Sequence, residues 1–220
     1  MISFRKVETD VLVIGAGITG LRAALSAVEK GARVIVASKG PRCSYGIMGF
    51  NAAVDSEDSQ ELYYSDILRS GKGLSDRTLA ALMAKGSAEQ KDYLEQCGLS
   101  FDKKADGSYD LIHPLGCSRP RLVHIGGETG TKSEKLFLEL LKKAGAEVSF
   151  DTTVIDLLSD GSTVYGALAV QKGEGICFQA KATVLAAAQQ VEKVKKATEG
   201  MKLVKTIYVK NKLMNLIVKP

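Results

Sequence analysis

Apolar residues over the first forty positions of the chain follow two different spacings. An uninterrupted apolar run at residues 11–14 predicts a buried strand, and Gly15 ends it. Apolar residues then recur at helical spacing over residues 21–28, and Gly31 interrupts this segment. A second run at residues 33–37, apolar after Arg33, predicts another strand. The order strand, tight turn, helix and strand predicts a βαβ unit at the start of the chain.

Helical periodicity and short apolar runs divide the rest of the chain. Residues 40–51 are rich in glycine and serine and predict a loop. Helices are expected over residues 58–71, 75–98 and 133–144, the second of them capped by Ser75 or Asp76. Strands are expected over residues 147–150, 154–158, 164–171, 176–180 and 182–187. Turn signals at residues 160–161 and 173–175 predict antiparallel pairing, whereas the apolar run at 182–187, interrupted by Thr183 alone, is typical of a buried parallel strand.

The turn after the first strand carries the glycine pattern GxGxxG. Gly15 leaves the strand where a Cβ would obstruct the turn, Gly17 permits close approach to a pyrophosphate, and Gly20 lets the helix pack against the strand. The amides that open the helix favour an anion at this position. The candidate nucleotide-binding residues are therefore Gly15, Ala16, Gly17, Ile18, Thr19 and Gly20. The alternative is a βαβ turn whose glycines serve packing alone.

The positive charge of the chain is concentrated near its C-terminus. The 220 residues have a formal net charge of +5, and residues 191–220 contain eight lysines and two glutamates, which is +6. The other 190 residues therefore carry a net charge of −1, which is +5 minus +6. This balance gives no case for a nucleic-acid-binding surface on the body of the protein. We expect one domain over residues 1–190 and a lysine-rich tail over residues 191–220.

Cysteine and histidine spacing matches no common metal or disulfide motif. The chain has four cysteines, Cys43, Cys97, Cys117 and Cys177. They form no CxxC pair and no disulfide framework, so we expect reduced thiols and a cytoplasmic protein. His113 and His124 have no metal-ligand spacing with them, and no metal site is expected. No apolar run approaches about 18 residues and residues 1–10 lack a signal-peptide core, so no transmembrane segment is expected.

Several short segments, taken in order along the chain, match the pattern of a known family. They are residues 10–17, 38–40, 48–53, 66–76, 121–124, 129–130 and 180–186. In this order and spacing they resemble the N-terminal part of the flavoprotein subunits of succinate dehydrogenase and fumarate reductase, and of L-aspartate oxidase. The similarity extends from residue 7 to about residue 188. It implies an α/β fold: a Rossmann-like FAD-binding domain over residues 1–190, with a parallel sheet flanked by helices and a small antiparallel sheet, lacking the capping domain.

The resemblance implies FAD as the cofactor and assigns further residues to it. Ser38, with Lys39 beside it, stands at the end of the second strand, where many dinucleotide folds place a carboxylate for the ribose. Ser44 and Gly49 belong to segments that lie beside the flavin ring in the family, and the backbone at Val154 would lie against the adenine. The other interpretation of the two serines is that they are ordinary polar loop residues.

The chain departs from the family pattern at positions that bear on the cofactor. The loop at residues 40–46 has no histidine, whereas the succinate and fumarate enzymes often attach FAD through one, so we expect non-covalent FAD. Met48 stands where the family has glycine, and residues 186–189 replace the family's Ala-Thr-Gly-Gly. His113 and His124 align with no catalytic histidine of the family. No catalytic residue is therefore assigned.

Three interpretations of function follow from these departures. Family members continue well beyond residue 190 with a capping domain that carries the catalytic residues, and residues 191–220 match none of it. The chain is therefore expected to bind FAD, within a family of oxidoreductases, without turning over succinate, fumarate or L-aspartate. Alternatively, it is one half of a split flavoenzyme, and a second polypeptide supplies the cap and the catalytic residues. The third interpretation is a non-catalytic remnant of a larger reading frame.

Overall fold

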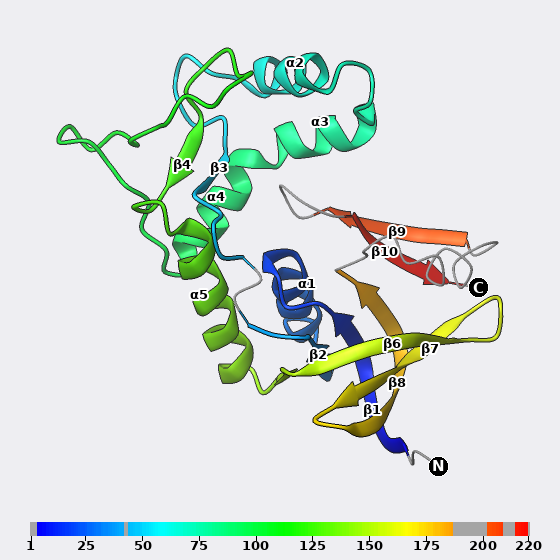
Figure 1. The fold of residues 1–220 in the computed structure, drawn as a ribbon. Coiled ribbons are helices and arrows are strands. Elements are labelled where there is room, and N and C mark those ends of the chain that lie inside the picture. Colours follow the sequence, from blue (N-terminus) through cyan, green and yellow to red (C-terminus); the bar gives the residue numbers. More distant parts are fainter. Residues whose placement is uncertain (1–3, 42–43, 187–201, 209–213, 220) are drawn as a thin grey trace. The chain divides into compact units, whose positions relative to one another are not determined.

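The computed structural model describes residues 4–41, 44–186, 202–208 and 214–219 (Figure 1). The chain divides into two compact units, of which the first comprises residues 1–43 and 137–220 and the second residues 44–136. The first unit is built on a large sheet, and the second on helices with a two-stranded sheet. Of the predicted tail at residues 191–220, two strands are described, and the rest lies outside the described residues.

Four parallel strands form the centre of the sheet in the first unit. Their order is β5 (Glu147–Ser149), β2 (Val34–Ala37), β1 (Phe4–Ile14) and β8 (Glu174–Leu185). Helix α1 (Ile18–Val28) connects β1 to β2, which confirms the predicted βαβ unit. The strand β1 begins earlier than the apolar run predicts, because its polar first half pairs with the first half of β8 while remaining largely exposed.

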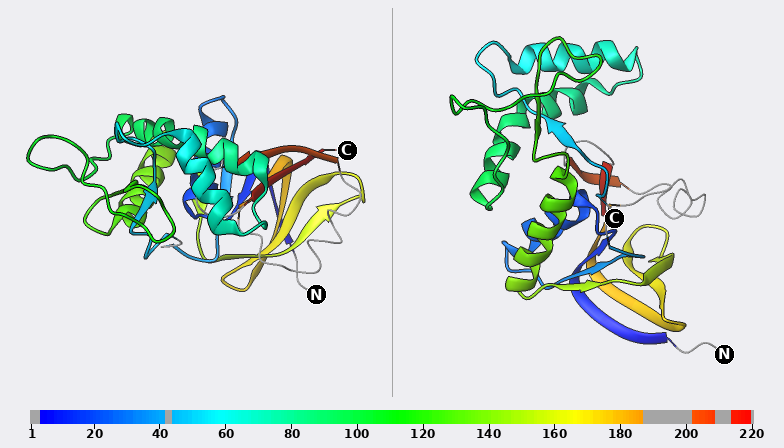
Figure 2. Two further views of the ribbon diagram at one scale, coloured as in Figure 1. Left: turned by 90° about the horizontal axis from the view of Figure 1, so that it is seen from above. Right: turned by 60° about the vertical axis from the view of Figure 1, so that its left-hand side comes forward.

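An antiparallel extension continues this sheet beyond β8. β6 (Thr152–Ser159) pairs with β7 (Val164–Gln171), and β7 pairs with β8, so that the three strands lie side by side (Figure 2). The two turns predicted between them are therefore confirmed. The segments predicted as separate strands at residues 176–180 and 182–187 form the single strand β8. The two segments form one strand because β1 pairs with β8 along almost its whole length, while β7 pairs with the first half of β8 on the other side.

The two described strands near the C-terminus also join the sheet. β9 (Lys202–Tyr208) and β10 (Met214–Lys219) pair antiparallel with each other. β10 is also paired with β8, where Leu216 lies opposite Leu185. The strand order of the sheet therefore continues from β8 to β10 and then to β9.

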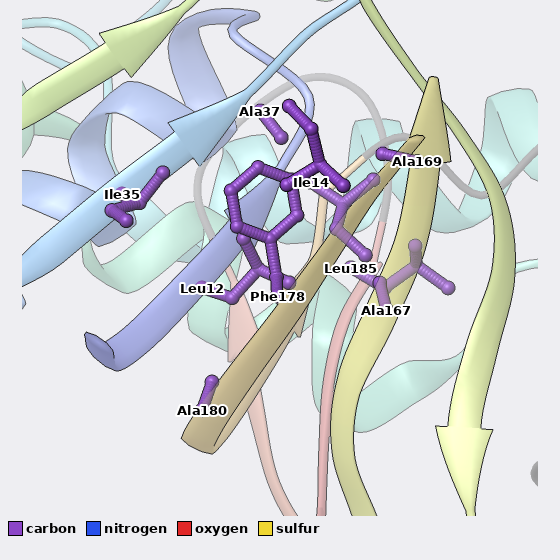
Figure 3. Close-up of a cluster of buried hydrophobic side chains, with 10 residues drawn as sticks. Leu12, Ile14, Ile35, Ala37, Ala167, Ala169, Phe178, Ala180 and Leu185 are labelled. Carbon is purple, nitrogen blue, oxygen red and sulfur yellow. The ribbon is translucent and has the colours of Figure 1, made fainter. Parts of the chain in front are cut away.

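A cluster of buried apolar side chains lies on one face of the sheet (Figure 3). β1 and β2 contribute Leu12, Ile14 and Ile35 to it, and alternate residues of a strand face the same side. Phe178 of β8 lies among them and is almost fully buried. The other members are Ala37, Ala167, Ala169, Ile176, Ala180 and Leu185. Burying a side chain such as Phe178 contributes roughly 1.5–3 kcal/mol, so one shared core stabilises the parallel strands and the antiparallel extension.

The second unit combines a short sheet with helices. β3 (Gly49–Asn51) and β4 (Leu122–His124) pair antiparallel. The helix predicted over residues 75–98 is in fact two helices, α3 (Arg77–Lys85) and α4 (Ser87–Gln96). The break falls at Gly86, whose φ of −77° and ψ of 2° leave the helical range. Glycine loses more conformational freedom in a helix than any other residue, so the break occurs where the helix is intrinsically weakest.

Side-chain caps explain where two helices of the second unit begin. The Ser59 hydroxyl accepts a hydrogen bond from the Leu62 N–H at 3.1 Å, ahead of α2 (Gln60–Gly71). The Asp76 carboxylate accepts one from the Leu79 N–H at 2.8 Å, ahead of α3. Of the two cap candidates in the sequence, Asp76 is therefore the residue that caps the helix.

A buried ion cluster is centred on Arg121 in the second unit. Arg121 Nη2 lies 2.9 Å from Asp58 Oδ1 and 3.0 Å from Asp66 Oδ2, and all three side chains are almost fully buried. The guanidinium also lies over the ring of Tyr63, 4.8 Å from its centroid. Burial raises the pKa of Asp58, whereas at Asp66 hydrogen bonds from Ser118 and the Arg121 charge outweigh burial and lower the pKa. Removing Arg121 would leave the buried Asp58 carboxylate without its cation, while Asp66 would keep its ion pair with Arg69.

Candidate nucleotide-binding site

The turn between β1 and α1 holds two of the predicted glycines. Gly15 has a φ of +106°, a conformation that favours glycine, and its N–H donates to the Ala37 carbonyl at 2.8 Å. Gly17 is the N-cap of α1, with extended backbone and no side-chain cap. Ile18, the first residue of α1, is half-buried, and the first turn contains no acidic residue. An anion placed at this end of α1 would meet the positive end of the helix dipole and no carboxylate of that turn.

Gly20 determines how closely α1 approaches the end of β1. A Cβ at position 20 would lie 1.9 Å from the Gly15 carbonyl oxygen and 3.1 Å from the Ala186 Cβ. This is the close helix–strand packing that the sequence predicts for Gly20. Two neighbouring candidate residues, Ala16 and Thr19, are buried as well. Residues 15–20 therefore form a tightly packed turn in which a larger residue at position 20 has no room.

The glycine turn lies where the strand order of the sheet reverses. From β1 the chain passes through α1 to β2 on one side, while β8 runs parallel to β1 on the other side. The Ala186 N–H, just after β8, donates to the Ile14 carbonyl at 2.9 Å, so the ends of both strands are joined. Open parallel sheets bind ligands outside the carboxyl ends of their strands at such a reversal.

Ser38 is fixed by hydrogen bonds at the end of β2. Its hydroxyl donates to the Gly40 carbonyl at 3.0 Å, and the residue is almost fully buried. Its N–H donates to the Ser149 carbonyl, and its carbonyl accepts from the Thr152 N–H, each at 3.0 Å. Lys39, the next residue, is exposed. The backbone of Ser38 thus lies between the end of β5 and the start of β6.

A side chain that belongs to no sequence motif contacts the same region. The Gln171 amide nitrogen, at the end of β7, lies 2.9 Å from Ser149 Oγ, 2.9 Å from the Phe150 carbonyl and 3.0 Å from Thr152 Oγ1. Gln171 ends an apolar strand and matches no motif. The sole signal available in the sequence is that a polar residue closes that strand.

Ser44, in the second unit, is held by helix α5 (Thr129–Lys143). The Ser44 N–H donates to the carboxylate of Glu134 at 2.8 Å, and both residues are buried. The Gly130 N–H donates to the Ile47 carbonyl at 2.8 Å, and a Cβ on Gly130 would lie 2.2 Å from the Ser44 carbonyl oxygen. The loop that follows Ser44 is therefore packed closely against the first turns of α5.

Gly49 has a packing role in the two-stranded sheet. A Cβ at this position would lie 2.4 Å from the Val123 carbonyl oxygen and 2.5 Å from a methyl carbon of Leu122. The preceding residue, Met48, accepts a hydrogen bond on its carbonyl from the Thr129 hydroxyl at 2.6 Å, while its side chain is 59% exposed. The methionine that replaces a family glycine therefore directs its side chain outward rather than into the strand pair.

Val154 lies in β6, two residues after Thr152. It pairs with Ala169 of β7, and the regular register is interrupted between Val154 and Asp156. Its side chain packs against the apolar cluster of the sheet. The Val154 side chain therefore adds to the core of the sheet, and its position is fixed by pairing with β7.

The two histidines have structural partners. One ring nitrogen of His124 lies 2.9 Å from an Asp102 carboxylate oxygen, and His113 Nε2 lies 2.8 Å from the Cys117 carbonyl oxygen. Across the described ranges, no group of three or more His, Cys, Asp or Glu residues is placed to hold a metal ion. Among the helices in those ranges, none combines the length and the apolar character that crossing a bilayer requires.

Comparison with known proteins shows what this arrangement belongs to. L-aspartate oxidase of Clostridium acetobutylicum is 32% identical over 185 residues, which cover 82% of this chain and 42% of the relative. A fumarate reductase (CoM/CoB) chain of Methanothermobacter marburgensis is 30% identical over 189 residues, covering 81% and 35%. The solved structure of Mycobacterium smegmatis Sdh1 in complex with UQ1 has a TM-score of 0.75 and 31% identity, covering 83% of this chain and 34% of that one.

The chain spans less than half the length of these relatives. A family model described as an FAD binding domain matches residues 10–214, which include the end of β1, the glycine turn, all of β2 and β8, and β9. The chain therefore belongs to the family of FAD-binding domains found in L-aspartate oxidases and in the flavoprotein subunits of fumarate reductase and succinate dehydrogenase.

Proposed function

We propose that this chain binds FAD non-covalently, with the diphosphate at the N-terminal end of α1. The observation that carries the proposal is the turn from Gly15 to Gly17. It follows the central strand at the reversal of strand order and leads into a helix whose N-cap has no side chain. The candidate contacts to the diphosphate are Gly15, Ala16, Gly17, Ile18, Thr19 and Gly20. Because a Cβ at Gly20 would meet backbone, the turn is shaped for glycine at that position.

The remaining cofactor contacts extend this proposal to both ends of FAD. Ser38 and Lys39 are assigned to the ribose, since Ser38 closes the second strand of the βαβ unit with a buried hydroxyl. The backbone of Val154 is assigned to the adenine. Ser44 and Gly49 are assigned to the flavin ring on the basis of the family resemblance. When bound, the flavin supplies two-electron redox chemistry, and these residues bind and orient it.

Non-covalent attachment is proposed because residues 40–46 contain no histidine. Denaturing the loaded protein with acid should therefore release all of its flavin into the supernatant. A flavin that stays with the precipitated protein, or that fluoresces in a denaturing gel, would show a covalent bond.

We propose an oxidoreductase reaction only for this chain together with the catalytic residues that it lacks, and not for the chain alone. The chain spans 34–42% of the three relatives named above, and no described residue is assigned a catalytic role. We expect flavin binding without turnover of succinate, fumarate or L-aspartate by the isolated chain. A second polypeptide that supplies the missing residues is the alternative, and its co-purification would support it. A cytoplasmic location is proposed from the free thiols of Cys97, Cys117 and Cys177.

The direct test is the visible absorption spectrum of the purified chain after FAD addition and desalting. We expect flavin bands in the wild type and their loss in Gly17→Leu, because a side chain at the N-cap would occupy the diphosphate position. The matched control is Gly86→Leu, which changes another N-cap glycine, that of α4. Circular dichroism of each variant shows that it is folded. A colourless wild type, or flavin retained by Gly17→Leu, would overturn the proposal.

A further inference from the structure

The short turn between β5 and β6 has an unusual backbone that needs support. It contains Phe150 and Asp151. The φ of Asp151 is +56°, in the left-handed region that residues other than glycine rarely adopt. The residues on either side, Ser149 and Thr152, are buried, and their hydroxyl oxygens lie 3.0 Å apart. A turn with this strain persists only when neighbouring groups hold it.

Gln171 provides that support from a strand distant in sequence. Its amide nitrogen is within 3.0 Å of three acceptors on the turn: Ser149 Oγ, the Phe150 carbonyl and Thr152 Oγ1. An amide nitrogen has two hydrogens, so the three contacts are shared between them. The bond to the Phe150 carbonyl fixes the middle of the turn, and the bonds to the two hydroxyls fix its ends.

The same turn holds the residues that we assign to the adenosine half of the cofactor. The Ser38 backbone bonds to both ends of the turn, from its N–H to the Ser149 carbonyl and from the Thr152 N–H to its carbonyl, each at 3.0 Å. Val154 follows the turn by two residues, in the first part of β6. A shift of the turn would therefore move Ser38 and Val154 together.

We infer that Gln171 is a positioning residue for the adenosine end of the FAD site. It acts through the turn at residues 149–152, on which the placement of Ser38 and Val154 depends. This inference rests on the proposed FAD binding and adds a determinant of affinity that lies outside the glycine turn. Gln171 itself is not assigned a contact with the cofactor.

The test compares Gln171→Met, Gln171→Glu and Gln179→Met in the full chain. Dissociation constants for FAD and for ADP are measured by calorimetry, and the melting temperature of each variant is recorded. Methionine keeps the length of glutamine without its donors, and glutamate keeps the shape but cannot donate to the Phe150 carbonyl. Gln179 is a matched control in the neighbouring strand β8, half-buried and with no side-chain hydrogen bond within the described part of the chain.

We expect both Gln171 variants to bind FAD and ADP about tenfold more weakly, by the same factor for each, while Gln179→Met matches the wild type. Equal weakening toward ADP identifies the adenosine half, and a purely structural role would lower the melting temperature without changing the affinity of the folded protein. Unchanged affinity in the Gln171 variants, or equal loss in the control, would overturn the inference.

The wild-type binding data and one further variant distinguish the failure of this inference from the failure of the proposed function. A wild type that binds neither FAD nor ADP refutes the proposed function itself, whereas a binding wild type with unaffected Gln171 variants refutes the positioning role alone. If neither Gln171 variant folds, Thr152→Val removes one of the three acceptors and should weaken FAD and ADP binding to a smaller, equal extent. No weakening by Thr152→Val would then count against the inference.

Discussion

Replacing Gly20 by alanine should destabilise the protein through a clash with backbone. The added Cβ would lie 1.9 Å from the Gly15 carbonyl oxygen, whereas real Cβ atoms essentially never approach within 3.0 Å, so α1 and the turn must separate by about 1.1 Å. A carbonyl oxygen cannot rotate away as a side chain can. Overpacking of this kind costs about 1–3 kcal/mol, and we expect the upper end of that range. For a chain of this size, about 3 kcal/mol lowers the melting temperature by roughly 6–12 °C.

Thermal denaturation followed by circular dichroism measures this effect, with Gly31→Ala as the matched control. Gly31 lies just beyond the opposite end of α1, with a φ of +81° and no heavy atom within 4 Å of an added Cβ. Alanine there meets backbone strain alone, about 1 kcal/mol or roughly 2–4 °C. Gly20→Ala should also lose bound FAD, because the turn that precedes it must shift. A melting temperature for Gly20→Ala no lower than that of Gly31→Ala would refute the reasoning.

Three further perturbations test other parts of the fold. Arg121→Met should cost about 3–5 kcal/mol in urea denaturation, because the buried Asp58 carboxylate loses its cation and Asp66 loses one of its two, and Arg121→Lys should restore little of it. Ser59→Ala removes the cap on α2 and should cost about 1 kcal/mol in the same assay, and no change would show that the cap is dispensable. A hydrogen bond from Lys181 and one from the Arg33 backbone hold the pKa of Asp10 at about 2, below its ordinary 3.8. Ionised Asp10 therefore favours the folded state, and its contribution should be complete above about pH 4 and disappear as the pH falls toward 2. Asp10→Asn should flatten that limb of a stability–pH curve, and an unchanged curve would contradict the assignment.

Much of the first unit could be predicted because its signals are local. The apolar run before Gly15, the helical spacing after Gly20 and the second apolar run lie within the first forty residues. The hairpin turns beside β7 could be predicted for the same reason, since Gly161 and Gly173 both have a positive φ within a few residues of the strands they join. In each case, the residue that ends one element and starts the next is visible in the sequence.

The parts that could not be predicted depend on contacts between distant residues. Gln171 reaches Ser149 across 22 positions, and the Ser44 N–H reaches Glu134 across 90. Nothing in the spacing of either pair along the sequence distinguishes its residues from other polar residues that make no such contact. The extension of β1 back to Phe4 has no local signal in the sequence, because its polar residues follow no apolar period. Pairing with β8 makes these residues a strand.

Ser38 illustrates how local and distant information combine at the site. Its position at the end of β2 is a local prediction, but the chemistry of its hydroxyl depends on the fold. The Ser38 hydroxyl donates its proton to the Gly40 carbonyl. Its oxygen can therefore only accept a hydrogen bond from a ribose hydroxyl, as a carboxylate would. A neutral acceptor makes a hydrogen bond roughly half as strong as a charged one, so a ribose bound at Ser38, as proposed, would contribute less to affinity than one bound by a carboxylate. In the proposed site, the diphosphate at the α1 N-terminus and the adenine contact of the Val154 backbone would then supply a larger share of the binding energy. That is why substitutions at Gly17 and Gln171, on separate elements of the same unit, should each weaken binding measurably.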